Sequence, residues 1–347
     1  MKLLLFNLTS DLSNPALGFT INWTNKIAIN YNKVFLITTF GRPEGLASNV
    51  ELYSLYTNPI KKNKFLALIR FYIYLFKILI FNKIDRCFTH MNPLFLALTF
   101  GLLRILKIKT ILWYTHPSKS LKLKLATVFC NKVITASKNS FPLKTGKALS
   151  IGHAIETDLF AKLSLNKNYI SCVGRISEVK NIDILLHSFS KLNTTLKLLI
   201  IGEPLTKKDE VYKNHLISLV NKLNIKEKVI FKSSVKREKL VKIYNESIVH
   251  VNLTSKGFLD KVALEAMSCG TISLSSNIGY SNVYGKHKDL LLFNFRDEVD
   301  LLKKITLLIE MDQNKREYIE KLIINNVREY HSINTIGSRI DKVFSSL

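Results

Sequence analysis

The chain has 347 residues, of which 47% are hydrophobic and 22% charged, a composition typical of a folded globular protein and not of a disordered one. A chain of this length exceeds one ordinary core, so we expect two domains. The formal net charge of +25 favours polyanionic partners such as lipid head groups, phosphates or nucleic acid. The four cysteines lie far apart and form no C-x-x-C pair, which favours a reducing, cytosolic setting over a disulfide framework.

The N-terminal segment "MKLLLFNLTSDLSNP" has a lysine and a short apolar run, but no small-residue cleavage site follows. We interpret residues 3–8 as a buried strand and not as a signal peptide. The apolar segment 65–81 is interrupted by Arg70 and Lys77 and is short for a membrane span. We therefore expect a helix there that is buried or lies along an interface.

Apolar runs and helix-length segments alternate along the first half of the chain. The predicted strands are 2–6, 33–39, 50–55, 86–90, 110–116, 132–137 and 148–152, and the predicted helices are 64–82, 93–106 and 118–130. Continuous apolar strands separated by helices indicate a parallel, doubly wound sheet.

After the polar stretch 161–168, which reads as a linker, the pattern starts again. The predicted strands are 169–174, 196–202, 229–234, 248–254, 271–276 and 290–294, and the predicted helices are 181–192, 208–224, 237–246 and 260–269, with a helical tail from Asp297. The fold class is therefore α/β, with two Rossmann-like domains facing across a deep cleft where a ligand would bind. We place the domains at 1–160 and 161–329, with a C-terminal helix at about 330–347 crossing back to the first.

The positive charge is concentrated in residues 61–150, which hold 17 Lys or Arg and a single acid, Asp85. Such a segment suits an anionic membrane surface or another polyanion. A lysine-rich proteome would give the same excess without a function, and both interpretations stay open.

Two stretches of the second half suggest a nucleotide site. In "GRISEVKNIDILL" (174–186), Gly174 allows a tight turn, and Arg175 with Lys180 suits a diphosphate, although two solvated surface cations would look the same. In "GFLDKVALEAMSCGT" (257–271), we expect a helix capped by Asp260 whose N-terminus binds phosphate. Glu265 would then offer its carboxylate to the diol of a ribose, which would satisfy an otherwise costly buried charge.

The sequence contains no D-x-D, no H-x-x-x-H, no P-loop and no G-x-S-x-G. We therefore expect neither a metal nor a cofactor, and expect protein cations to neutralise a bound diphosphate. Three histidines are candidates for a role. His116 follows a predicted strand that points toward the cleft, His90 either meets an acceptor or caps the sheet, and His153 suits a contact between domains.

Several stretches in this order resemble the retaining GT-B glycosyltransferases of family four. They are "NPALGF", "LWYTHPS", "SIGHAIETDLF", "GRISEVKNIDILLHSF", "LLIIGEP", "VIFKSSV" and "LEAMSCGTISLSS". The resemblance implies that Arg175 and Lys180 grip the diphosphate, that Glu265 contacts the ribose and that His116 lies near the donor sugar. It implies the donor-binding set Gly18, Gly174, Arg175, Lys180, Gly257, Phe258, Leu259, Asp260, Lys261 and Glu265, and the catalytic set His116, Arg175 and Lys180.

One departure from the family pattern concerns its E-x7-E motif, since Gly257 stands where the first glutamate usually lies. The stretch resembles a branch that reads G-x-x-D-K, in which backbone amides or Asp260 and Lys261 would contact the sugar hydroxyls. The departure concerns the contacts to the donor sugar and not the reaction.

The resemblance implies a metal-independent, retaining glycosyltransferase that moves a hexose-type sugar from a nucleotide-diphosphate sugar to an acceptor hydroxyl. From the charge distribution we expect a lipid-linked or polysaccharide acceptor, and a cytoplasmic protein bound peripherally to the inner face of the cell membrane. Two alternatives stay open. One is an epimerase or phosphorylase with the same fold, and the other is a basic polyanion-binding protein, although no helix-turn-helix, zinc or RNA-recognition signature indicates nucleic acid.

Overall fold

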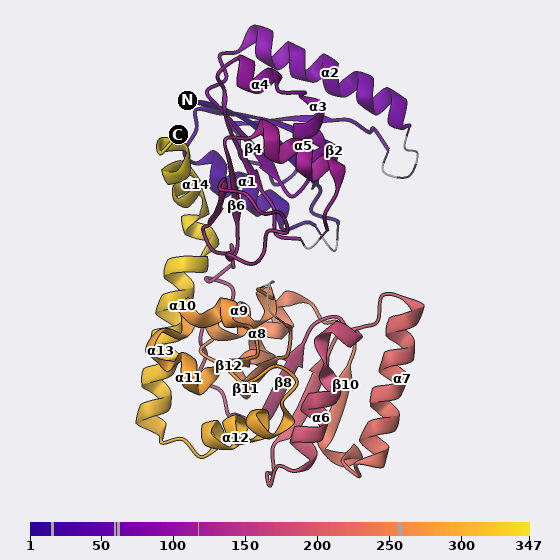
Figure 1. The fold of residues 1–347 in the computed structure, drawn as a ribbon, viewed down its shortest axis with the longest axis vertical. Coiled ribbons are helices and arrows are strands. Elements are labelled where there is room, and N and C mark those ends of the chain that lie inside the picture. The colour runs from indigo at the N-terminus through magenta and orange to yellow at the C-terminus, as the bar shows by residue number, and fades with distance from the viewer. Residues whose placement is uncertain (15–16, 59, 61–62, 117, 256–258) are drawn as a thin grey trace. The chain divides into compact units, whose positions relative to one another are not determined.

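The computed structural model describes residues 1–14, 17–58, 60, 63–116, 118–255 and 259–347, which form two α/β units (Figure 1). The first unit contains residues 1–154 and 333–347, and the second contains residues 155–332. The divisions thus lie a few residues from those that the sequence suggested, at 160 and 329. Phe160 is buried in the core of the second unit, and Ile155 forms a β-bridge with Ser332 of the same unit.

The first unit contains a seven-stranded sheet in the order β3-β2-β1-β4-β5-β6-β7, with every neighbouring pair parallel. The strands are β1 (Lys2–Ser10), β2 (Lys33–Gly41), β3 (Val50–Ser54), β4 (Arg86–His90), β5 (Lys109–Trp113), β6 (Lys132–Thr135) and β7 (Ala148–Ser150). The helices are α1 (Thr20–Ala28), α2 (Lys64–Phe81), α3 (Pro93–Leu98), α4 (Leu102–Ile105), α5 (Leu121–Phe129) and α14 (Ile336–Ser345).

Alternation along β1 divides the core of this unit into two layers. Leu4 and Phe6 pack with residues of α2, α3 and α5, whereas Leu3 and Leu5 pack with residues of α1 and α14. Figure 1 shows both ends of the chain in this unit. The C-terminal helix is therefore part of the first core.

The second unit contains a five-stranded parallel sheet in the order β10-β9-β8-β11-β12. The strands are β8 (Tyr169–Val173), β9 (Lys197–Ile201), β10 (Val229–Lys232), β11 (Ser247–Asn252) and β12 (Ile272–Ser275). The helices are α6 (Ile182–Ser190), α7 (Lys207–Lys222), α8 (Arg237–Asn245), α9 (Lys261–Ser268), α10 (Ser281–Tyr284), α11 (Lys288–Leu291), α12 (Glu298–Ile309) and α13 (Gln313–His331). The expected pair of Rossmann-like parallel sheets is confirmed.

Two local predictions were wrong, and one helix had no prediction. The helix expected at 93–106 is broken into α3 and α4, because Phe100 and Gly101 adopt left-handed backbone conformations with φ of 46° and 82°. The strand expected at 290–294 begins inside α11, and it makes only a single bridge, from Leu292 to Ser275. No prediction covered α1, whose inward face includes Trp23 and Ile27.

Candidate functional site

The candidate site lies at the carboxyl edge of the second sheet, where the strand order reverses between β8 and β11. Crevices at such a reversal are where open α/β sheets bind their ligands. A pocket opens here between the ends of the two strands. It is lined by Cys172, Val173, Gly174, Arg175, Lys180, Ile182, Val251, Asn252 and Leu253. Three residues singled out from the sequence, Gly174, Arg175 and Lys180, therefore line one pocket.

Two glycines allow the loops at this edge to approach each other closely. Gly174, directly after β8, has a φ of +142°, and Gly202, directly after β9, has a φ of +148°. Residues other than glycine rarely adopt either value. A Cβ atom on Gly202 would lie 1.9 Å from the carbonyl oxygen of Gly174. Gly202 was not identified from the sequence, although a glycine directly after an apolar strand was the available signal.

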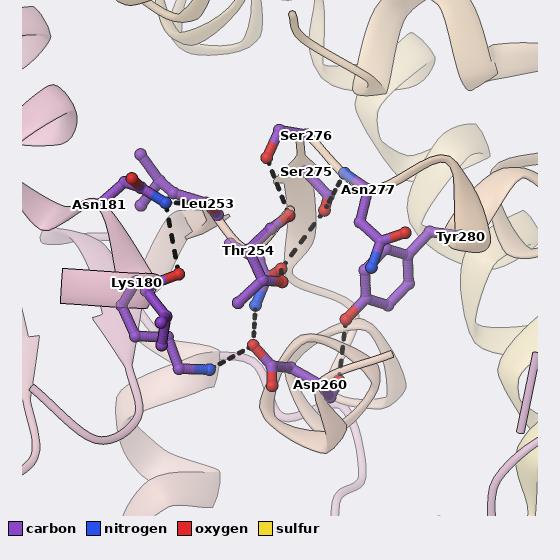
Figure 2. A network of polar contacts seen from close by, with 11 residues as sticks. Lys180, Asn181, Leu253, Thr254, Asp260, Ser275, Ser276, Asn277 and Tyr280 are labelled. Carbon is purple, nitrogen blue, oxygen red and sulfur yellow. Dashed lines mark hydrogen bonds and ion pairs between the residues drawn. The ribbon is translucent and has the colours of Figure 1, made fainter. Parts of the chain in front are cut away.

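Lys180 of the pocket forms a salt bridge with Asp260, with 2.5 Å between Nζ and Oδ2 (Figure 2). The same carboxylate oxygen accepts a 2.8 Å hydrogen bond from Nδ2 of Asn252. Both charged side chains are only about a fifth exposed, so water screens the pair incompletely. The ammonium group of Lys180 is thereby held at the start of α9.

Asp260 does not cap α9 in the way that the sequence suggested. The residue occupies the N-cap position, but its side chain makes no capping hydrogen bond. Its carboxylate binds Lys180 and Asn252, while its backbone carbonyl accepts a 2.9 Å hydrogen bond from the Tyr280 hydroxyl (Figure 2). Its negative charge is therefore committed to the lysine that was expected to bind a diphosphate.

Asn181 ties the loop that carries Lys180 to the end of β11. Its backbone is left-handed, with a φ of 46°, and its Nδ2 donates to the carbonyl of Leu253 at 3.2 Å (Figure 2). Its Oδ1 accepts a 2.8 Å hydrogen bond from Nε of Arg296. These hydrogen bonds hold the loop that carries Lys180 in place. Neither Asn181 nor Arg296 was identified from the sequence as a site residue.

Glu265 is buried, with 8% of its surface exposed, and it has a cationic neighbour within the protein. Nη2 of Arg237, the first residue of α8, lies 3.9 Å from its Oε1, and Arg237 also pairs with Glu156. Burial raises the pKa of the Glu265 carboxyl, while Arg237 and Lys261 oppose that rise. A ligand is thus not needed to give Glu265 a partner, and Arg237 is a site residue that the sequence analysis missed.

The remaining predicted donor-site residues divide between the units. Leu259 is buried in the second core, and Gly257 and Phe258 lie outside the described residues. Gly18 belongs to the first unit, in the loop after β1, where an added Cβ would lie 2.9 Å from the carbonyl oxygen of Asn14. A glycine is therefore required at that turn for steric reasons alone.

The three candidate histidines all lie in the first unit. His116 is exposed after β5, and its Nδ1 accepts a 3.1 Å hydrogen bond from the backbone of Ser118. His90 is buried at the end of β4, with its ring 4.6 Å from that of Trp23 and its Nδ1 3.3 Å from Oδ1 of Asn7. His153 is also buried, edge-on to the ring of Trp113.

The described residues offer neither a metal site nor a membrane-spanning helix. No group of three or more His, Cys, Asp or Glu side chains in that part of the chain is placed to hold a metal ion. None of its helices is both long enough and apolar enough to cross a membrane. All four cysteines are buried and free.

Comparison with known families identifies the second unit. Residues 155–324 match the family described as glycosyl transferases group 1, so they form a domain of that family. The Campylobacter jejuni N-acetylgalactosamine-N,N'-diacetylbacillosaminyl-diphospho-undecaprenol 4-alpha-N-acetylgalactosaminyltransferase is 26% identical over 46% of this chain and 42% of its own length. The D-inositol 3-phosphate glycosyltransferase of Rhodococcus jostii is 34% identical over 34% of this chain and 28% of its own length. The chain therefore spans less than half the length of these curated relatives.

The fold as a whole also has solved counterparts. HepE from Anabaena, solved in complex with UDP, matches all of both chains with a TM-score of 0.77 at 16% identity. At this identity the likeness establishes the fold alone. It confirms the expected GT-B class, with its two Rossmann-like units.

Proposed function

From a chain whose second unit is a glycosyl transferases group 1 domain, we propose a retaining hexosyltransferase that uses a nucleotide-diphosphate sugar and needs no metal or other cofactor. The observation that carries the proposal is that Gly174, Arg175 and Lys180 line one pocket at the strand reversal of that domain. Glu265 lies in the helix that begins at this pocket with Asp260. The UDP bound to HepE, a protein of the same fold, agrees with a nucleotide donor.

In this proposal the cations of the pocket receive the diphosphate. Arg175 is exposed and offers a forked set of donors, and Lys180 offers a point charge that Asp260 and Asn252 hold in place. When the diphosphate binds, it competes with Asp260 for the ammonium group. Backbone amides at the start of α9 add partial positive charge for the same anion.

The reaction we propose is a substitution on one face of the sugar. The acceptor oxygen bonds to the anomeric carbon as the bond from that carbon to the diphosphate oxygen breaks. The proton of the acceptor hydroxyl passes to the departing diphosphate. Arg175 and Lys180 stabilise the charge that develops on this leaving group, which is where electrostatic catalysis acts most strongly. His116 of the first unit would act near the donor sugar.

For the acceptor we propose a glycan attached to a lipid, or a growing polysaccharide. The printed name of the Campylobacter relative includes a diphospho-undecaprenol acceptor, and the first unit of this chain carries the cationic segment 61–150. Such charge favours the anionic, cytoplasmic face of a membrane, where we place the protein as a peripheral enzyme.

The proposal is tested by calorimetry of the purified protein with UDP, GDP, ADP, CMP and their sugar conjugates. We expect one nucleoside diphosphate to bind, and Arg175→Ala and Glu265→Ala to weaken that binding by roughly tenfold or more, as for a lost charged hydrogen bond. Lys208→Ala is the matched control. Lys208 is an exposed cation of α7 that pairs with Glu178, and Glu178 lies in the loop that carries Arg175 and Lys180. Equal losses in all three variants, or no binding by the parent, would contradict the donor site.

Product analysis then tests the reaction. Incubation of the protein with the identified sugar nucleotide and a lipid-linked acceptor should give a new glycosidic bond with the donor's anomeric configuration, in the presence of EDTA. An inverted product would refute retention, and a requirement for Mg²⁺ would refute the metal-free step. Epimerised donor, or a sugar phosphate formed only with added phosphate, would instead identify an epimerase or a phosphorylase.

A further inference from the structure

Helix α2 carries two apolar faces, and only one of them is covered by the protein. Its inner face consists of Ala67, Phe71, Leu75 and Ile78, which are all buried in the first core. A second row, which we call the outer face, consists of Phe65, Ile69, Ile73, Phe76 and Ile80. These side chains are 71%, 41%, 56%, 47% and 72% exposed, respectively.

Helix geometry places the two rows on opposite sides. Each outer residue from Phe65 to Phe76 precedes an inner one by two positions, and two positions rotate by about 200° around an α-helix. An ordinary surface helix carries charged and polar residues on the side away from the core. Here that side is apolar over the length of an 18-residue helix, about 27 Å.

Exposed apolar side chains also occur in and beside α4. Phe100, Ile105 and Leu106, in or beside α4, are 69%, 77% and 49% exposed. The Tyr72 hydroxyl donates a 3.0 Å hydrogen bond to the carbonyl of Leu98, so α2 is anchored beside the end of α3 that leads into α4. An exposed apolar row as long as the outer face of α2 is typical of an interaction site.

The exposed charges on α2 and α4, and on the residues just after each helix, are positive. Lys64, Lys77 and Lys83 are exposed on or just after α2, and Arg104 and Lys107 are exposed on or just after α4. No acidic residue occurs between Glu51 and Asp85 in the sequence. A partner must therefore offer apolar surface bordered by negative charge.

We infer that the outer face of α2 inserts into the interfacial layer of an anionic membrane, with the helix lying in the plane of the surface. Interfacial helices bury their apolar side chains at the boundary between head groups and acyl chains, while flanking lysines and arginines bind anionic head groups. A second copy of this chain fits less well, because its equal basic border would face this one with like charge. The inference deepens the proposed function and rests on it only for the lipid-linked acceptor.

The first test is flotation with vesicles of phosphatidylglycerol and phosphatidylcholine, and with vesicles of phosphatidylcholine alone. The parent should bind the anionic vesicles and release them at high salt. The triple variant Ile73→Glu, Phe76→Glu and Ile80→Glu should partition into the vesicles more than about tenfold more weakly. A tenfold change in partitioning corresponds to roughly 1.4 kcal/mol. Burial of each of these apolar side chains contributes over half of that amount, so the loss of all three exceeds it.

The matched control carries the same three charges on the second unit. Leu205, Val211 and Ile217, beside or on α7, are 73%, 69% and 42% exposed. Their triple change to glutamate should leave vesicle binding within about twofold of the parent, apart from the shared change in net charge. Equal loss of vesicle binding in both triple variants would overturn the inference. Equal binding of the parent to anionic vesicles and to vesicles of phosphatidylcholine alone would also overturn it.

A reporter variant locates the inserted residue. The native Trp23 and Trp113 are 3% and 2% exposed, so brominated lipids should quench them little. Phe76→Trp should shift its emission to shorter wavelength and be quenched by brominated lipid in anionic vesicles, whereas Val211→Trp should show neither effect. Quenching of both or of neither would overturn the inference.

Light scattering and nucleotide binding separate the remaining outcomes. A dimeric parent that the α2 triple variant converts to a monomer, without vesicle binding by either, would assign the outer face to self-association and overturn the inference. Calorimetry with the nucleoside diphosphate should be unchanged in the α2 triple variant. If the parent binds nucleotide but not vesicles, the inference fails and the proposed function stands. If the parent binds vesicles but no nucleotide, the inference stands and the proposed function fails.

Discussion

The two sheets have their first five strands in the same order, but the units differ in the chemistry at the point where that order reverses. In the first unit, Asn7 and His90 meet there beside the ring of Trp23, so the contact joins an amide to aromatic rings. In the second unit, Lys180 and Asp260 meet there as a partly buried ion pair. The same backbone arrangement thus supports two different sites, because function resides in the side chains that the fold presents.

The units differ in a second respect, since exposed groups distinguish the first and partly buried ion pairs distinguish the second. The first unit carries the apolar outer face of α2 with its basic border, whereas the second carries the salt bridges of the pocket and of Arg237 with Glu156 and Glu265. We read the first unit as the one that meets a lipid-borne partner and the second as the one that holds a charged donor. Four predictions test that division.

The largest effect is expected for Arg175→Ala combined with Lys180→Ala in the second unit. Because both cations would stabilise the departing diphosphate, the transfer rate should fall by roughly 10³-fold or more. The measurement is turnover of radiolabelled sugar nucleotide. The control pairs Lys77→Ala with Lys83→Ala in the first unit and should leave turnover with a water-soluble acceptor within about twofold. A comparable loss in that control would remove the distinction between the units.

A steric change should destabilise the second unit selectively. Gly202→Ala would place a Cβ atom 1.9 Å from the carbonyl oxygen of Gly174 at a φ of +148°, so we expect unfolding to become easier by roughly 3 kcal/mol. Calorimetric unfolding and hydrogen exchange should locate the loss in residues 155–332. Gly146→Ala is the control, since nothing lies within 4 Å of its added Cβ. Unchanged stability in Gly202→Ala would mean that the loop after β8 can move aside.

His116→Ala tests whether the first unit takes part in the chemistry. If His116 acts near the donor sugar, kcat should fall by roughly tenfold to a hundredfold, as for a lost catalytic proton-transfer or positioning group. The affinity for the nucleoside diphosphate should stay the same, because the charged pair lies in the other unit. His215→Ala, an exposed histidine on α7, provides the control. A loss of nucleotide affinity in His116→Ala would contradict this separation of roles.

The smallest effect concerns the stability contributed by Glu265. Burial raises the pKa of this carboxyl above its ordinary value of 4.5, so the folded state binds more protons than the unfolded state between the two pKa values. The contribution of Glu265 to stability is therefore greatest at low pH and falls as pH rises through the raised pKa. Glu265→Gln should raise the Tm at neutral pH, by roughly 2–4 °C for each 1 kcal/mol, and this gain should vanish toward pH 4.5.

Glu265→Gln should also weaken nucleotide binding, because a neutral amide accepts hydrogen bonds from a ribose less strongly than a carboxylate does. Greater stability with weaker binding would identify Glu265 as a residue kept for its ligand. A lower Tm at neutral pH would show instead that the pair with Arg237 outweighs the burial of the charge.

Local patterns in the sequence were sufficient to predict most of the fold. Continuous apolar strands separated by helices identified twelve strands of two parallel sheets, because burial on both faces leaves that pattern in the sequence. The loop 174–180 was identifiable because a glycine after a strand, followed by two cations, is itself a local pattern. The break at Gly101 was missed, since one left-handed glycine in an apolar run does not distinguish a bend from a helix.

Contacts between distant segments were decided by the tertiary structure alone. Lys180 meets Asp260, Glu265 meets Arg237, and Gly202 meets Gly174, each pair joining segments that follow different strands. The sequence likewise determined that α2 is apolar, but only the packed core shows which of its two faces is covered. Parallel strands bring their carboxyl ends to one edge whatever their separation along the chain, so partners there leave no local spacing to read.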